Sequence, residues 1–177
     1  DYDFLTHVYS RSGLYEALKH EETHRHTRFL TVMLLDIDYF KSINDNYGHE
    51  CGDRVLASFA RQVQQVVGED GMVARMGGEE FAVVVNSGDA QHGFELAERI
   101  RSTVASHPFT WRHQTLYLTV SIGLGSGKAE SWQLTEVFNK LMAEADDHLY
   151  RSKKAGRNRT SARVADEQIA APSGSET

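Results

Sequence analysis

Apolar residues follow two kinds of pattern along the chain, and the first kind predicts strands. A short, nearly uninterrupted apolar run over 29–35 is typical of a strand buried on both faces. Two further runs, 72–75 and 81–85, flank a Gly-Gly pair, which indicates a hairpin. Apolar and polar residues alternate over 116–123, as in a strand with two different faces.

The second pattern, with apolar residues three and four positions apart, predicts amphipathic helices. The predicted helices cover 11–24, 51–67, 96–104 and 134–149. Strands and helices therefore alternate, with a hairpin in the middle of the chain. This order predicts an α/β or α+β fold, in which helices cover a layered sheet.

Length and composition fit one globular domain. The chain has 177 residues, of which 40% are hydrophobic, enough for one core and little more. After Thr160 the residues become small and polar, so we expect a domain over 1–160 and a disordered tail over 161–177. Because the chain starts at Asp1 rather than Met, we expect it to be cut from a longer protein.

Charge, hydropathy and cysteine content exclude several classes of protein and of binding site. A net charge of −6 argues against nonspecific binding to nucleic acid or to an anionic membrane. No apolar run reaches the length of a membrane span, and no signal peptide is visible. Cys51 is the only cysteine, which excludes an intramolecular disulfide and a cysteine metal cluster. A reducing, cytoplasmic compartment is the simplest interpretation.

Asp36 and Asp38 directly follow the predicted buried strand. A carboxylate there lies at the edge of the sheet, where many α/β folds bind ligands. Mg²⁺ prefers one or two carboxylates, with phosphate and water completing its coordination, and Asp36 fits that need. Taken alone, however, Asp36 is better explained as a strand-end residue that caps a turn.

Gly77-Gly78-Glu79-Glu80 lies between the predicted hairpin strands. The glycines permit positive φ angles and the close approach of a phosphate to the backbone. Two adjacent carboxylates repel each other unless solvent or a cation compensates them. An ordinary solvated turn has the same composition, so this motif alone is weak support for function.

Lys153, Lys154 and Arg157 lie at the end of the last predicted helix. Basic residues there suit the helix dipole, which is the structural interpretation. A Lys and an Arg one helical turn apart could instead grip a triphosphate.

These features occur together, in order, within long motifs that closely resemble the GGDEF family of diguanylate cyclases, in a variant with Glu at the third position. The motifs are Asp36-Ile37-Asp38-Tyr39-Phe40-Lys41-Ser42-Ile43-Asn44-Asp45, Gly48-His49, Gly52-Asp53, Arg75-Met76-Gly77-Gly78-Glu79-Glu80-Phe81 and Tyr150-Arg151-Ser152-Lys153-Lys154-Ala155-Gly156-Arg157-Asn158. The resemblance runs from about Asp3 to about Arg159. It implies a fold like the palm of nucleotide cyclases and polymerases, with a mostly antiparallel central sheet flanked by helices.

The resemblance implies an enzyme that condenses two GTP molecules into cyclic di-GMP and two pyrophosphates. Two Mg²⁺ ions, which Mn²⁺ could replace, would be held by the Asp36 carboxylate, the Ile37 carbonyl and Glu79. Glu79 is also the implied proton acceptor, and Glu80 would assist the metal or hold the hairpin. The substrate-binding residues implied are Asn44 and Asp53 for guanine, His49 for a further contact, Tyr39, Phe40 and Lys41 for backbone contacts to phosphate, and Lys153 and Arg157 for gripping phosphate.

One such domain holds one GTP, so the resemblance also implies a homodimer during catalysis. It implies an upstream sensory or membrane region in the longer protein, which could tether a cytoplasmic domain to the inner membrane. Two other functions remain open: a catalytically inactive GTP-binding or dimerisation module, and a receptor for cyclic di-GMP.

The chain departs from the family pattern in two places. His7, Ser10 and Ser12 replace family residues in an N-terminal motif that is mainly structural. The family's inhibitory product site, Arg-x-x-Asp, falls on Gly68 to Gly71, where the chain reads Gly-Glu-Asp-Gly. We therefore expect no inhibitory product site and no binding of cyclic di-GMP at that position.

Overall fold

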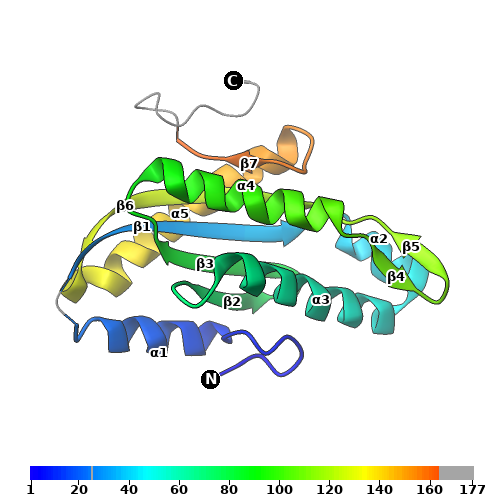
Figure 1. Ribbon diagram of the computed structural model, residues 1–177, viewed down its shortest axis with the longest axis horizontal. Coiled ribbons are helices and arrows are strands. Elements are labelled where there is room, and N and C mark those ends of the chain that lie inside the picture. The colour runs from blue at the N-terminus through cyan, green and yellow to red at the C-terminus, as the bar shows by residue number, and fades with distance from the viewer. Residues whose placement is uncertain (25, 164–177) are drawn as a thin grey trace.

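In the computed structural model, which describes residues 1–24 and 26–163, a five-stranded sheet with strand order β2-β3-β1-β6-β7 forms the centre of the domain (Figure 1). Its strands are β1 (Thr27–Ile37), β2 (Met72–Gly77), β3 (Glu80–Asn86), β6 (Val120–Glu130) and β7 (Thr160–Ser161). The pairs are antiparallel except β6 with β7. The predicted mixed fold with a mostly antiparallel central sheet is confirmed.

Helices cover both faces of the sheet. They are α1 (Arg11–Glu21), α2 (Phe40–Tyr47), α3 (His49–Val67), α4 (Ala90–Ser106) and α5 (Leu134–Lys154), with a 3₁₀ turn η1 (Ser131–Gln133) before α5. A short separate hairpin, β4 (Phe109–Trp111) and β5 (Gln114–Leu116), follows α4. No helix within the described ranges is long and apolar enough to cross a membrane.

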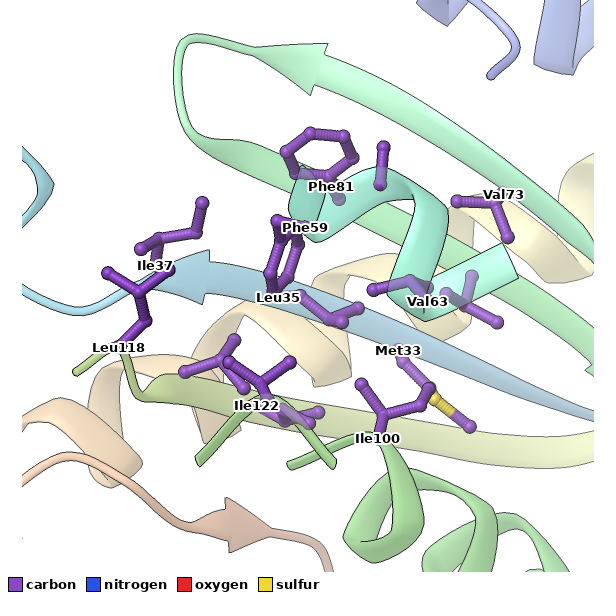
Figure 2. Packing of buried hydrophobic residues seen from close by; sticks show 14 of the residues in the cluster. Met33, Leu35, Ile37, Phe59, Val63, Val73, Phe81, Ile100, Leu118 and Ile122 are labelled. Atoms are coloured by element: carbon purple, nitrogen blue, oxygen red, sulfur yellow. The ribbon is translucent and has the colours of Figure 1, made fainter. Parts of the chain in front are cut away.

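The central strand β1 is buried on both faces, as its apolar run predicts. Met33, Leu35 and Ile37 point into a core shared with α3 and α4, where Phe59 packs at 5.1 Å from the ring of Phe81 (Figure 2). The alternate residues of β1 belong to a second core with α1 and α5. Two cores, one on each side, hold this strand in a fixed register.

The structure corrects two of the predicted elements, the strand over 116–123 and the helix over 96–104. The predicted strand over 116–123 is wrong, because the chain leaves β5 at Leu116 and enters β6 only at Val120. Between them, the Thr119 carbonyl accepts a hydrogen bond from the Asp38 backbone N–H at 2.9 Å, which draws this segment to the end of β1. β6 then continues to Glu130. The helix predicted over 96–104 begins earlier, at Ala90, because the Asp89 side chain caps it by accepting a hydrogen bond from the His92 N–H.

The end of the predicted domain is close to the end of the described structure. β7 pairs in parallel with β6, with Ile122 opposite Thr160 and Gly123 opposite Ser161. The ordered sheet therefore includes one residue that we expected in the tail. Residues 164–177, which hold most of that predicted tail, lie outside the described residues.

Glycines in β6 allow α5 to lie directly against the sheet. A Cβ atom at Gly123 would collide with the Ala145 carbonyl oxygen and the Leu149 backbone nitrogen, both in α5. A Cβ atom at Gly127 would meet only Leu141 Cδ2, at an ordinary 3.5 Å. The close approach of helix and strand thus depends on the missing side chain at Gly123.

Gly123→Ala should lower the free energy of unfolding by about 2 kcal/mol or more, because backbone atoms of α5 cannot move aside as a flexible side chain could. Gly127→Ala, on the same strand, is the control and should change it by less than about 0.5 kcal/mol. Urea denaturation followed by circular dichroism measures both. Equal stability of the two variants would show that α5 does not depend on backbone contact at Gly123.

Candidate active site

Two adjoining clefts open among the described residues. The first lies where the end of β1, α2, the β2–β3 turn and the end of α5 meet, and the second lies where α2, α3 and the β2–β3 turn meet. The first has a volume of about 520 Å³ and the second about 390 Å³. Phe40, Lys41 and Glu79 line both clefts. The predicted site residues thus line one or both clefts, although they come from segments far apart in the sequence; Glu80 is the exception and lines neither cleft.

The first cleft contains the acidic residues expected to hold a metal. Asp36 lies opposite Glu80 of β3 on one side and Ser121 of β6 on the other. The turn that follows β2 brings Glu79 to the same cleft, and its backbone carbonyl lies 3.5 Å from the Ile37 N–H that donates to it. The structure therefore brings Asp36, Ile37 and Glu79 to one place.

Basic residues line the other side of the first cleft. Lys153, in the last turn of α5, donates from Nζ to Asp36 Oδ2 at 2.7 Å. Arg157, in the loop after α5, lines the cleft together with Tyr39. Lys41 also lines it, although its Nζ bonds the exposed Asp45 carboxylate at 2.9 Å. The cleft therefore combines carboxylates with cations.

The segment expected to be a phosphate-binding loop is the N-terminus of a helix. Tyr39 is the N-cap of α2, with φ 58° and no side-chain capping bond, and Phe40 and Lys41 form the first turn. The first N–H groups of a helix have no partner within the helix, and the helix dipole is positive there. The predicted helices did not include α2. An anion in this cleft would meet both features of its N-terminus.

Asn44, His49 and Asp53 line the second cleft. The Asn44 Oδ1 atom is buried and has no hydrogen-bond partner. Asn44 packs directly on Gly52, where a Cβ atom would collide with that oxygen. Because a buried acceptor without a donor is costly, Asn44 suits a ligand that brings N–H groups.

Arg75 also lines the second cleft, and the sequence alone assigns it no role. Its Nε donates to the Gly78 carbonyl at 2.9 Å, and its Nη1 lies 3.3 Å from both carboxylate oxygens of Asp3. Burial opposes ionisation of Asp3, but hydrogen bonds from Thr6 and the Arg75 charge outweigh it and lower the pKa of Asp3. Arg75 thus ties the Gly-Gly turn to the N-terminal segment.

Asp38 serves a structural purpose. It is buried and accepts hydrogen bonds from the Thr119 hydroxyl at 2.7 Å and the Ser121 hydroxyl at 2.6 Å. It also accepts from the backbone N–H of Asn158 at 3.0 Å. These bonds fasten the loop after α5 to the end of β1, so this carboxylate is already engaged.

Glu80 differs from Glu79 in its surroundings. Burial raises the pKa of Glu80, and repulsion from Asp36 and Asp146 adds to the rise, against attraction from Lys153 and Arg11. Glu80 therefore gives up its proton less readily than an exposed glutamate. A cation placed beside Asp36 would oppose this rise, since it favours the ionised form of neighbouring carboxyl groups.

The donor atoms of the first cleft suit a hard divalent cation. Asp36, Glu79 and the Ile37 carbonyl offer oxygen only, which matches the preference of Mg²⁺ and Mn²⁺. Within residues 1–24 and 26–163, no three His, Cys, Asp or Glu side chains gather into a metal cluster. Phosphate and water complete the coordination of Mg²⁺ in nucleotide sites, so a set of two carboxylates fits such an ion.

Comparisons with known proteins identify one family. Residues 1–159 match the family described as "Diguanylate cyclase, GGDEF domain". The chain is 68% identical over 161 residues to the probable diguanylate cyclase DgcF of Escherichia coli K12, covering 91% of this chain and 51% of that protein. The chain thus spans about half the length of this relative.

Solved structures give the same result. The diguanylate cyclase SiaD of Pseudomonas aeruginosa, solved with its activator SiaC, is 30% identical with a TM-score of 0.81, over 92% of this chain and 61% of that one. The active GGEEF domain of a diguanylate cyclase from Vibrio cholerae is 33% identical with a TM-score of 0.66, over 76% and 83% of the two chains.

Proposed function

The chain belongs to the GGDEF family of diguanylate cyclases, and we propose that it condenses two GTP molecules into cyclic di-GMP and two pyrophosphates. One observation carries the proposal: acidic and basic residues of the first cleft adjoin the buried unpaired acceptor of the second, with Glu79 lining both. The solved relative from Vibrio cholerae is described as an active GGEEF domain, which supports activity with Glu at the third motif position.

The guanine base of GTP fits the second cleft in this proposal. Guanine offers a ring N–H and an amino group on one edge, and an ionised Asp53 can accept from both. Asn44 supplies an amide for the same edge, and its unpaired Oδ1 gains a donor when the base binds. His49 lines the cleft as a further contact.

The triphosphate lies in the first cleft in this proposal. Lys153 and Arg157 would provide positive charge there, and Phe40 and Lys41, in the first turn of α2, line the same cleft and would offer their backbone N–H groups to phosphate. Asp36, Glu79 and the Ile37 carbonyl would hold Mg²⁺, or Mn²⁺, which supplies charge stabilisation for the transferring phosphoryl group.

The chemical step forms one bond and breaks another at the α-phosphorus. The 3′-hydroxyl oxygen of the second GTP bonds to it, the bond to the β-phosphate oxygen breaks, and pyrophosphate leaves in line. Glu79, which lines both clefts, would accept the hydroxyl proton. Lys153 and Arg157 neutralise charge as it develops on the phosphates. Glu80, opposite Asp36 in the sheet, sets the local charge and holds the hairpin.

A single chain presents one such pair of clefts among its described residues, and therefore one place for GTP. Cyclic di-GMP needs two GTP molecules that attack each other. We therefore propose that two copies of the chain face each other during catalysis, as a homodimer that need only be transient.

Asp36→Asn should lower the rate of cyclic di-GMP formation from GTP and Mg²⁺ by at least about 100-fold. Residues one step removed from a metal typically cost 10- to 100-fold when changed, and Asp36 would contact the metal itself. Asp147→Asn on α5, exposed and outside both clefts, is the matched control and should retain the parent rate. Chromatography of the cyclic di-GMP formed measures the rates of the parent, Asp36→Asn and Asp147→Asn. Glu79→Gln, measured in the same way, should lose activity as Asp36→Asn does.

Two results would contradict this proposal. Parent-like turnover by Asp36→Asn would mean that Asp36 holds no metal needed for catalysis. A parent protein that binds GTP but forms no cyclic di-GMP would be an inactive GTP-binding or dimerisation module instead.

We also propose that the enzyme lacks the family's Arg-x-x-Asp form of product inhibition. Gly68 and Gly71 offer no side chain for a phosphate or base, and the exposed Glu69 and Asp70 add negative charge. At Gly71 a Cβ atom would collide with Val67 and would meet Val85 Cγ1 at 2.7 Å, so an aspartate could not be accommodated without local movement.

Cyclic di-GMP should therefore cause no noncompetitive inhibition at saturating GTP, although weak competition at the active site is compatible with product resembling substrate. Initial rates across a product titration, together with calorimetry, test this. Tight product binding with noncompetitive inhibition would show that another surface has replaced the missing site.

A further inference from the structure

The loop after α5 holds Arg157 in an unusual backbone conformation. Arg157 and Asn158 have φ angles of 66° and 47°, a left-handed region that side chains disfavour. Such residues persist when their surroundings fix them. The Arg157 N–H donates to the Ser152 carbonyl at 2.9 Å, and Asn158 is held by Asp38 through its N–H and by Arg101 Nη1 at its Oδ1, each at 3.0 Å.

The far end of the Arg157 side chain is held separately. Its guanidinium carbon lies 4.9 Å from the centre of the Tyr39 ring. Tyr39 is 67% exposed, but its backbone is fixed between the buried Asp38 and the buried Phe40. Since the backbone of Arg157 is already fixed, this stack sets the direction of its guanidinium group at the wall of the first cleft.

The other cations of this cleft are held differently. Lys153 is paired with Asp36 and Lys41 with Asp45. Among the residues that the structure describes, no carboxylate lies within 4.0 Å of Arg157 in an ion pair. A carboxylate partner would compete with an incoming phosphate. The face of an aromatic ring orients a guanidinium and leaves its charge and its N–H donors available.

We propose that Tyr39 is a positioning residue, which holds the Arg157 guanidinium ready for the phosphates of the bound nucleotide. This inference rests on the proposed function, because it takes the ligand to be a nucleoside triphosphate. The ring of Tyr39 acts on the nucleotide only indirectly, by orienting the guanidinium group of Arg157. Its role is therefore separate from that of the backbone N–H groups at the start of α2.

Tyr39→Leu removes the ring and keeps an apolar side chain of moderate size that, like tyrosine, is not branched at Cβ. It should weaken binding of a non-hydrolysable GTP analogue, with an imido group between the β- and γ-phosphates, by about 2- to 5-fold. Binding of GMP, which lacks those phosphates, should not change. Tyr39→Phe keeps the ring and should restore most of the lost affinity.

Calorimetry with Mg²⁺ present would compare parent, Tyr39→Leu, Tyr39→Phe, Arg157→Ala and the double variant Tyr39→Leu/Arg157→Ala. Tyr150→Leu is the matched control, because Lys154 Nζ lies 5.6 Å from the Tyr150 ring and neither residue lines a cleft. This control should bind the analogue as the parent does. In the Arg157→Ala background, loss of the Tyr39 ring should have no further effect.

The inference is overturned if Tyr39→Leu binds the analogue as tightly as the parent, or if the loss persists in the Arg157→Ala background. A loss of GMP binding equal to the loss of analogue binding would also overturn it, since that would reflect general damage to the site. These results differ from failure of the proposed function. In that case the parent itself would bind neither GMP nor the analogue, or it would bind GTP without forming cyclic di-GMP.

Discussion

The pairing of β1 with β3 and β6 is the constraint on which the rest of the site depends. Hydrogen bonds on both edges and apolar cores on both faces fix its register. That register places Asp36 opposite Glu80 and beside the turn that carries Glu79. A slip by one residue would turn Asp36 to the opposite face of the sheet. Beyond the strand, Asp38 fastens the loop that carries Arg157, so one strand end positions both the acidic and the basic side of the cleft.

Charge balance explains why this strand end needs cations. Asp36 and Glu80 lie opposite each other where two inner strands of the sheet end, and burial with repulsion from Asp36 raises the pKa of Glu80. Lys153 partly offsets this repulsion through its bond to Asp36. A divalent cation held by Asp36 and Glu79 would offset it further, and the triphosphate would then take up the positive charge of Lys153. Ligand binding would thus replace the Lys153–Asp36 ion pair with two others, one between Asp36 and the cation and one between Lys153 and the triphosphate.

The spacing of apolar and polar residues along the sequence predicted the strands and helices in which this spacing is regular. The apolar run over 29–35 and the glycine pair at the hairpin correspond to β1 and to the β2–β3 turn. The start of α2 could not be predicted in this way, because Tyr39 caps it in a left-handed conformation without the usual capping side chain. The break before Val120 depends on bonds to Asp38, a contact between distant segments. Roles for individual site residues came from the family resemblance, whereas the stack of Arg157 on Tyr39 required coordinates.

In the proposed function, each chain provides half of a site that makes cyclic di-GMP. The most direct test is the specific activity with GTP and Mg²⁺ over a dilution series, measured beside the oligomeric state at each concentration. We predict that activity per chain falls steeply as dimers dissociate, because a monomer holds one GTP and cannot close the ring. Constant activity per chain at concentrations where sizing shows only monomer would contradict it.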